Sequence, residues 1–162
     1  MSIIGIVAVD KHNAIGKAGG LPWHYSADMK FFKQQTTGNV CVMGYRTWLS
    51  LKKPLPNRLN IILSRSAEVE PRESLIAMRD KESVLALVPY LSCDVFVIGG
   101  AQVYRTFLDD IDKWIVTEVP IVVDGADAFM PEDFLKGFRA LEEKQLEQDL
   151  KVTFYDRTTG PV

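Results

Sequence analysis

The sequence predicts an α/β fold: a single domain with a central mixed, mostly parallel β-sheet, about four flanking helices and a C-terminal antiparallel edge hairpin. Three observations lead to this prediction. The length of 162 residues suits one domain. Continuous apolar, β-branched runs alternate with helical patterns, which is typical of parallel strands covered on both faces. The last two strand-like stretches, in contrast, follow each other with only a short turn between them.

Six apolar runs predict the buried strands, at residues 3–9, 40–43, 59–63, 75–78, 95–98 and 114–119. Four helical patterns lie between them, at residues 26–36, 45–51, 81–90 and 101–108. Ser26 is placed to cap the first helix, and Gly38 is placed to end it. Residues 139–147 and 151–157 predict the hairpin. Residues 10–23 form a glycine-rich irregular segment, longer than usual loops, and we expect an active-site loop there.

The composition excludes several classes of protein. The chain is 47% hydrophobic and 25% charged, which excludes disorder and collagen-like repeats. No apolar run approaches the roughly 18 residues of a membrane span, and no basic leader precedes the first strand, so we expect a cytoplasmic protein. Cys41 and Cys93 have no metal-ligand spacing, and we expect neither a metal site nor a disulfide.

The charge is distributed unevenly along the chain. The net charge of -2 argues against a nucleic-acid or anionic-membrane partner. Residues 29–67, however, contain no Asp or Glu. Seven cations stand in this acid-free segment: Lys30, Lys33, Arg46, Lys52, Lys53, Arg58 and Arg65. They form either a solvated positive face or a surface that receives a small polyanion.

Asp28 is the candidate acid of the site. It stands in the first turn of the helix predicted from residue 26, where the helix dipole favours a carboxylate, so a purely structural role is the simple alternative. Phe32 lies one turn later on the same face, and Trp23 comes just before the helix. A carboxylate among aromatic side chains is typical of a site that recognises a ligand with paired N–H donors, and its pKa is open to a shift.

One glycine pair and several cations predict a phosphate site formed by three strand ends. Gly99 and Gly100 join a strand to a helix, where backbone approaches a ligand closely, although an ordinary strand-to-helix turn has the same pattern. The pattern is not the G-x-G-x-x-G of the dinucleotide fold. Arg46, Ser64 and Arg65 follow two further strands and could hold phosphates.

In order and spacing, these segments resemble the motifs of the dihydrofolate reductase family, and the resemblance spans nearly the whole chain. The segments are Leu21-Pro22-Trp23, Asp28, Phe31-Phe32, Met43-Gly44, Thr47-Trp48, Pro54-Leu55-Pro56-Asn57-Arg58, Ile61-Ile62-Leu63-Ser64-Arg65 and Ile98-Gly99-Gly100-Ala101-Gln102-Val103-Tyr104. The resemblance implies one dihydrofolate-reductase-like domain over residues 1–162, with an adenosine-binding subdomain at about residues 38–88. It implies hydride transfer from NADPH to C6 of 7,8-dihydrofolate with protonation of N5, and hence a place in one-carbon metabolism.

The resemblance also implies roles for individual residues. Asp28 would hydrogen-bond the pterin with support from Thr117, and Trp23 would hold an ordered water. Arg58 would bind the α-carboxylate of the glutamate tail. The other substrate contacts would be Ile6, Ala8, Met29, Phe32, Leu51, Leu55, Ile98 and Tyr104.

The implied cofactor contacts follow the glycine and cation motifs. Ala8, Ile15, Gly16 and Leu21 would flank the nicotinamide. Gly44, Tyr45, Arg46, Thr47, Gly99, Gly100, Ala101, Gln102, Val103 and Tyr104 would approach the pyrophosphate, with a cis bond between Gly99 and Gly100. Ser64 and Arg65 would meet the 2′-phosphate, and Leu63 and Ile98 would add further contacts.

A few positions depart from the family pattern. Tyr45 stands where many members have a phosphate-binding Arg, and Gln102 replaces a cation found in some members. The segment around Asp127 carries an added residue, and the turn between the last two strands is short. We therefore expect phosphate binding to depend on Arg46 and Arg65, and the movement of the loop at residues 10–23 to differ.

Two other functions fit part of the pattern. A riboflavin-pathway reductase of the same fold also uses NADPH, but it would not be expected to need Trp23, Asp28 or Arg58. A pterin- or antifolate-binding protein that has lost turnover would be stabilised by ligand without oxidising NADPH. The family also implies a monomer that binds antifolate inhibitors, with no nucleic-acid or membrane partner.

Overall fold

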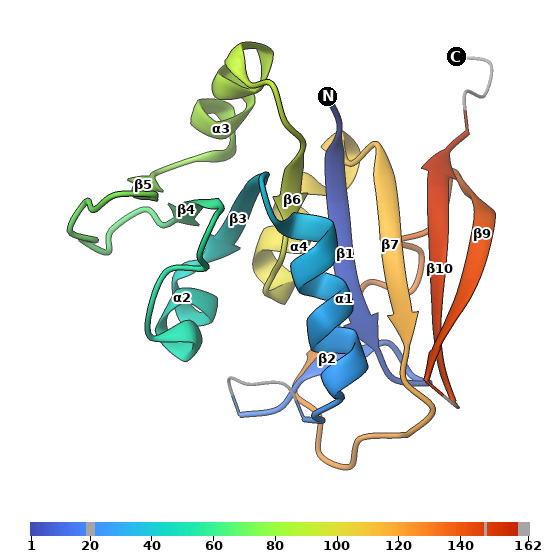
Figure 1. Ribbon diagram of the computed structural model, residues 1–162. Helices are drawn as coiled ribbons and strands as arrows, with labels where there is room; N and C mark the ends of the chain where they lie inside the picture. The colour runs from blue at the N-terminus through green and yellow to red at the C-terminus, as the bar shows by residue number, and fades with distance from the viewer. Residues whose placement is uncertain (19–21, 148, 159–162) are drawn as a thin grey trace.

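The computed structural model describes residues 1–18, 22–147 and 149–158. Its centre is an eight-stranded sheet in the order β5-β4-β3-β6-β1-β7-β10-β9 (Figure 1). The six strands from β5 to β7 are parallel, and β10 and β9 add an antiparallel pair at one edge. The strands are β1 (Ile3–Val9), β3 (Val40–Gly44), β4 (Leu59–Leu63), β5 (Leu75–Met78), β6 (Val95–Val97), β7 (Lys113–Glu118), β9 (Phe138–Glu147) and β10 (Leu150–Arg157). The predicted fold class is confirmed.

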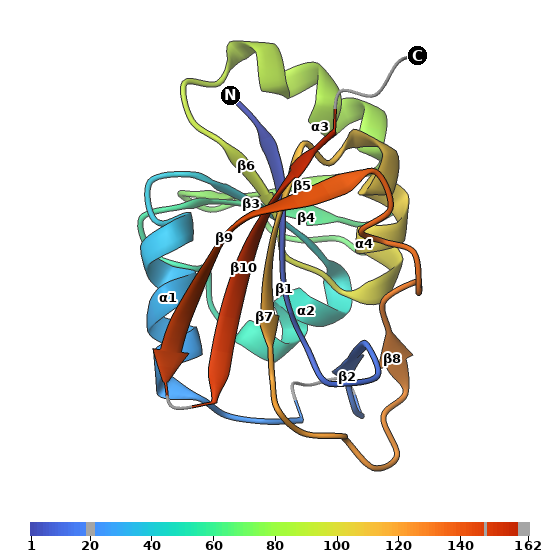
Figure 2. The same cartoon turned by 90° about the vertical axis from the view of Figure 1, so that its right-hand side faces the viewer.

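Helices cover both faces of the sheet and bury the inner strands on both sides. The helices are α1 (Ser26–Thr36), α2 (Tyr45–Leu51), α3 (Lys81–Leu87) and α4 (Ala101–Phe107). Phe31 of α1 and Trp48 of α2 pack in one apolar cluster, and Val84 of α3 and Phe107 of α4 pack in the other. Figure 2 shows α1 and α4 on opposite sides of the sheet.

The element boundaries agree closely with the prediction. The first two helices have the predicted limits, and the other two end in short 3-10 turns, η1 (Val88–Tyr90) and η2 (Leu108–Asp110). Leu150 at the start of β10 pairs with Glu147 at the end of β9, so the predicted short turn is confirmed. No helix in the described residues is long and apolar enough to cross a membrane.

Two local predictions were wrong. Ser26 does not cap α1: the N-cap position is Tyr25, which makes no side-chain capping bond, and Ser26 is the first helical residue. The backbone N–H of Ala27 instead donates to Oε1 of Glu147, at 3.3 Å. The segment at residues 10–23 is also not wholly irregular. It contains β2 (Ala14–Gly16), which pairs with β8 (Ala128–Phe129) in a separate two-stranded sheet.

A buried aromatic cluster supports the middle of the sheet. Trp114 of β7 is fully buried and lies against Gly5, its partner in β1. A Cβ on Gly5 would lie 2.3 Å from the indole ring, so only glycine leaves room for it. The ring centroids of Tyr104 and Phe134 lie 5.8 and 5.1 Å from that of Trp114. The cluster therefore holds α4, which carries Tyr104, against the sheet.

Candidate functional site

The site forms where the carboxyl ends of adjacent parallel strands meet. Strands β4, β3, β6 and β1 lie side by side, and each is followed by a segment that carries candidate residues. The segment after β4 carries Ser64 and Arg65, and that after β3 carries Gly44 and Arg46. Ligands of open α/β sheets bind at this edge. The fold thus gathers candidates that lie far apart in the sequence.

Asp28 enters the site from the first turn of α1 and is half-buried. Burial raises the pKa of its carboxyl above the usual range, and a hydrogen bond from the side chain of Thr117 on β7 opposes that shift. Thr117 itself is 2% exposed. A carboxylate with this raised pKa is one whose charge the protein stabilises only in part, and it can accept further N–H donors.

Tyr104 lies close to this carboxyl and is 4% exposed. Its hydroxyl donates to the backbone oxygen of Ile6 at 2.7 Å. Burial and the charge of Asp28 both raise the pKa of the Tyr104 hydroxyl, so the phenol stays neutral and acts as a donor. Ile6 is consequently fixed at the point where β1 passes the site.

An apolar cluster lies on the same face of the sheet as α1. Most of the predicted substrate contacts belong to it: Ile6, Phe32, Leu51, Leu55 and Ile98. Met29 lies on α1, three residues before Phe32, and is 49% exposed. Ala8 lies on β1 and is half-buried. These side chains can cover the faces of a flat ring system next to Asp28.

Arg58 is a buried cation, 5% exposed, in the acid-free segment. Its Nε donates to the backbone oxygen of Pro56 at 2.9 Å, and its Nη1 donates to Oγ1 of Thr36 at 3.0 Å. Its position is thereby fixed between α1 and the segment before β4. A guanidinium held in this way is preorganised for a carboxylate.

Two glycine turns form a narrow cradle between β3 and β6. The N–H of Gly44 donates to the oxygen of Gly99 at 2.8 Å, and the bond between Gly99 and Gly100 is cis, as predicted. A Cβ on Gly44 would lie 3.1 Å from Val103, and a Cβ on Gly99, where φ is +112°, would lie 3.1 Å from Tyr104. The positive φ strongly favours glycine at residue 99, and at residue 44 a side chain would press against Val103. At Gly100 a Cβ would meet only Oγ1 of Thr47, at 3.9 Å, so the backbone is open to a ligand there, which suits the pyrophosphate of a dinucleotide.

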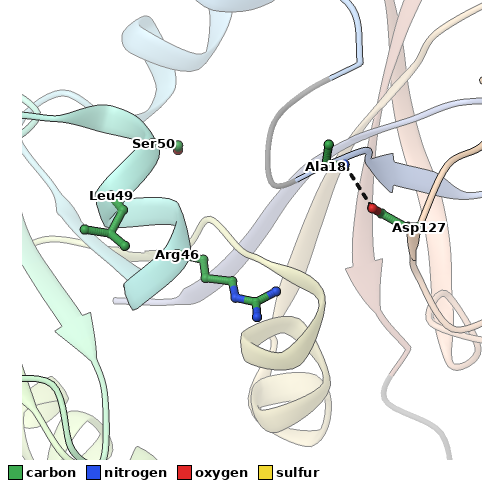
Figure 3. A pocket seen from close by; sticks show the side chains of 5 residues that line it. All are labelled: Ala18, Arg46, Leu49, Ser50 and Asp127. Carbon is green, nitrogen blue, oxygen red and sulfur yellow. Dashed lines mark hydrogen bonds between the residues drawn. The ribbon is translucent and has the colours of Figure 1, made fainter.

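A shallow, open pocket of about 500 Å³ lies between α2 and the segments that carry Ala18 and Asp127 (Figure 3). Arg46, Leu49 and Ser50 of α2 line one side, and Ala18 and Asp127 line the other. The N–H of Ala18 donates to Oδ2 of Asp127 at 2.9 Å, so the segment after β2 is fastened to the segment before β8. The exposed Arg46 supplies positive charge at the mouth of the site. The structure thus adds Leu49 and Ser50 to the candidate residues.

Most of the remaining cofactor candidates follow the same strand ends, and two lie in the separate strand β2. Arg65 is exposed beyond β4, and the hydroxyl of Ser64 accepts from the N–H of Ala67 at 3.0 Å. Tyr45, 37% exposed, begins α2, where Thr47 follows. Leu63 ends β4. Ala101, Gln102 and Val103 form the first turn of α4, where Gln102 is exposed. Ile15 and Gly16 are buried in β2.

Trp23 and Leu21 come from the loop itself. The indole Nε1 of Trp23 is buried and has no hydrogen-bond partner in the described part of the chain, so it can donate to a ligand or a water. Leu21 lies outside the described residues.

One buried carboxylate was not among the candidates predicted from the sequence. Asp10, directly after β1, is 4% exposed and accepts three backbone N–H bonds, from His12, Ala14 and Val123. Burial on its own raises the pKa of this carboxyl, but the three N–H bonds and the nearby His12 outweigh it, so the pKa is lowered. An Asp directly after an apolar strand and before a long loop was the available sequence signal.

Comparisons with known proteins agree with this geometry. The family model described as dihydrofolate reductase matches residues 2–158. A dihydrofolate reductase from Haemophilus influenzae is 37% identical over 127 residues, covering 78% of this chain and 77% of that protein. One from Bacillus subtilis is 32% identical over 146 residues, covering 90% and 85%.

A solved structure is similar over almost its full length. Dihydrofolate reductase from Enterococcus faecalis, complexed with NADP(H) and RAB-propyl, superposes with a TM-score of 0.87 at 27% identity, covering 96% of each chain. The fold, the glycine cradle and the family match lead to one conclusion: the chain belongs to the dihydrofolate reductase family.

Proposed function

We propose that this chain reduces 7,8-dihydrofolate to 5,6,7,8-tetrahydrofolate, with NADPH, when bound, supplying the hydride that reaches C6 of the pterin. The single observation that carries the proposal is the half-buried Asp28 carboxyl. Burial raises its pKa, and its charge acts on Tyr104, whose ring would lie 3.1 Å from a Cβ on Gly99 of the glycine cradle. The family match supports the same reaction.

Asp28 accepts the paired N–H groups of the pterin edge, at N3 and the 2-amino group. Thr117 holds the carboxyl in place, because its hydroxyl bonds to Asp28 from the neighbouring β7. The unpartnered Nε1 of Trp23 donates to a water beside the pterin. The proton for N5 arrives through water, while the nearby carboxylate raises the basicity of N5.

The rest of the substrate contacts divide by chemistry. Ile6, Phe32, Leu51, Leu55 and Ile98 pack on the pterin and benzoyl rings, with Ala8, Met29 and Tyr104 at the margins. Arg58 binds the α-carboxylate of the glutamate tail, because it is a fixed, buried guanidinium in a segment without acids. These contacts orient C6 for hydride transfer.

The cofactor contacts follow the strand ends. Ile15 and Gly16 flank the nicotinamide, together with Leu21. The pyrophosphate lies on the glycine cradle near Arg46 and Thr47, with Tyr45, Ala101, Gln102 and Val103 beside it. Residues 38–88 act as the adenosine-binding subdomain, in which Leu63, Ser64 and Arg65 meet the adenosine. No residue of the cradle adds a side chain that would close it to a pyrophosphate.

Arg65 reads the 2′-phosphate that distinguishes NADPH from NADH. It is exposed at the end of β4, where it can make a bidentate contact with a phosphate. Arg65→Ala should therefore reduce the ratio of kcat/KM values for NADPH and NADH by about tenfold or more. An unchanged ratio would assign this recognition to another residue.

The first experiment follows NADPH absorbance on addition of dihydrofolate, with and without methotrexate. Oxidation that methotrexate inhibits supports the proposal. A folded protein that binds methotrexate without oxidising NADPH would instead be a binding protein, the alternative from a different class. The raised pKa of Asp28 and the intact cradle disfavour that alternative. The proposal also takes the protein to be cytoplasmic and monomeric. Gel filtration can test the oligomeric state.

A further inference from the structure

Asp10 binds both backbone groups of Ala14. Its Oδ1 accepts from the N–H of Ala14 at 2.8 Å, and its own N–H donates to the oxygen of Ala14 at 3.1 Å. Oδ1 also accepts from His12 at 2.8 Å. The side chain and the backbone of Asp10 together define the turn that leads from β1 into β2.

This turn sets the position of the residues proposed to contact the nicotinamide. Ala14 is the first residue of β2, and Ile15 and Gly16 complete the strand. Strand β2 pairs with β8, and the N–H of Asp127, just before β8, donates to the oxygen of Gly16 at 3.1 Å. Any shift of Ala14 relative to β1 would move Ile15 and Gly16 with it.

Asp10 also joins two segments that are more than a hundred residues apart. Its Oδ2 accepts from the N–H of Val123 at 2.8 Å, next to a backbone bond from Lys11 to Ile121 at 3.0 Å. A second side-chain bond joins the same two segments in the opposite direction, from the N–H of Ala18 to Oδ2 of Asp127. That bond is exposed to solvent, whereas only 4% of Asp10 is exposed. Water can replace the exposed bond at little cost, whereas it replaces the part-buried bond from Val123 to Asp10 less readily.

We propose that Asp10 is a positioning residue for hydride transfer, because it fixes β2 against the segment 119–127 and so holds Ile15 and Gly16 at the nicotinamide. This role rests on the proposed function. Asp10 itself contacts neither the substrate nor the cofactor in this proposal. Within the segment 119–127, Asp127 at the end makes the exposed bond to Ala18, and Val123 in the middle makes the bond to Asp10.

Asp10→Asn separates the two parts of this arrangement. The amide oxygen can still accept from His12 and Ala14, but the amide NH2 then faces the N–H of Val123, so two donors meet. The turn is kept and the bond between the segments is lost. Asp112→Asn is the control for the loss of a carboxylate that bonds to the backbone of β1: Oδ2 of the exposed Asp112 accepts from the N–H of Ile3 at 2.8 Å, at the opposite end of that strand.

The kinetic test measures single-turnover NADPH oxidation at saturating concentrations of both ligands, together with the Kd of NADPH and of methotrexate. Misplacement of the nicotinamide should slow turnover by about tenfold in Asp10→Asn. If β2 keeps its place for only about a fifth of the time, the Kd of NADPH rises about fivefold. The Kd of methotrexate should stay unchanged, and Asp112→Asn should match the wild type in all three.

Equal losses of NADPH and methotrexate affinity would indicate a general structural defect and would overturn the proposal, as would wild-type turnover in Asp10→Asn. Amide hydrogen exchange gives a readout that does not depend on activity. Exchange at residues 14–16 should be at least about tenfold faster in Asp10→Asn and unchanged in Asp112→Asn. Unaltered exchange would contradict the role of Asp10 even if the wild type proved inactive, whereas inactivity alone contradicts only the proposed function.

Discussion

Two carboxylates of this protein, the buried Asp10 and the half-buried Asp28, differ in how many hydrogen bonds the chain donates to them. Asp10 accepts three backbone N–H bonds at 2.8 Å each, and its pKa is lowered. Asp28 receives a hydrogen bond from the Thr117 side chain, which burial outweighs, and its pKa is raised. The two residues lie in neighbouring segments of the chain, so their environment and not their position in the sequence creates the difference.

The comparison teaches how to separate a structural acid from a ligand-binding one. Where the protein supplies enough donors, the charge is stable and the residue holds the fold together. Where it supplies too few, burial penalises the charge until a ligand brings its own donors. The residue type does not distinguish the two cases, whereas the number of hydrogen-bond donors does.

The largest expected effect is on turnover when Asp28 loses its charge. Asp28→Asn should lower kcat at pH 7 by about a hundredfold or more, because a neutral amide stabilises the pterin much less well. Steady-state kinetics at saturating dihydrofolate measure this, and Asp112→Asn should keep the wild-type rate. Near-normal turnover of Asp28→Asn would make this carboxyl as structural as that of Asp10.

The second effect is on stability when Asp10 is removed. Asp10→Ala leaves three N–H groups without their acceptor and should lower the free energy of unfolding by about 2–3 kcal/mol, as measured in urea. Because the pKa of Asp10 is lowered in the folded state, its contribution is present above the usual pKa of an aspartate and is lost as the pH falls through the folded value. The deficit of the variant should therefore shrink in acid. A constant deficit from pH 7 to pH 3 would contradict the account.

The third effect has the opposite sign. The raised pKa of Asp28 means that the folded, ligand-free protein loses stability as the pH rises from the usual aspartate pKa through the raised one. Asp28→Asn should thus raise the Tm at pH 7 by about 2 °C, and the gain should vanish below the usual aspartate pKa. Thermal unfolding at both pH values checks it. A lower Tm at pH 7 would show that the charge of Asp28 is well satisfied without a ligand.

The smallest effect concerns Asp127, whose bond to Ala18 is exposed. Asp127→Ala should change the free energy of unfolding by less than about 0.5 kcal/mol, because water replaces the lost acceptor. Together with Asp10→Ala, this variant compares two losses of unfolding free energy: one from an exposed bond and one from less exposed bonds between the same two segments. Equal losses in the two variants would mean that burial does not decide the outcome.

The sequence was sufficient where one local pattern decides the structure. The apolar runs predicted the main strands, and the helical spacing predicted α1 and α2 to the residue. Gly44 and Gly99 pointed to the cradle, because few other residues permit such close turns. Asp28 stood out because aromatic residues surround it in the sequence.

The missed features depend on partners that are distant along the chain. Strand β2 has three residues and no period of its own, and it exists only because β8, more than a hundred residues later, pairs with it. The amide of Ala27 is bound by Glu147, so the capping potential of Ser26 stays unused. Asp10 likewise gains its importance from Val123. Local patterns carry no information on such pairings.

The most direct test of the account is the pKa of the Asp28 carboxyl, read from its carbon resonance in the free protein and in the methotrexate complex. Asp28→Asn assigns the signal. The account predicts a pKa above that of an ordinary aspartate in the free protein and well below it in the complex, because the ligand supplies the missing N–H donors. A free value at or below the ordinary one, or a value that binding does not lower, would contradict it.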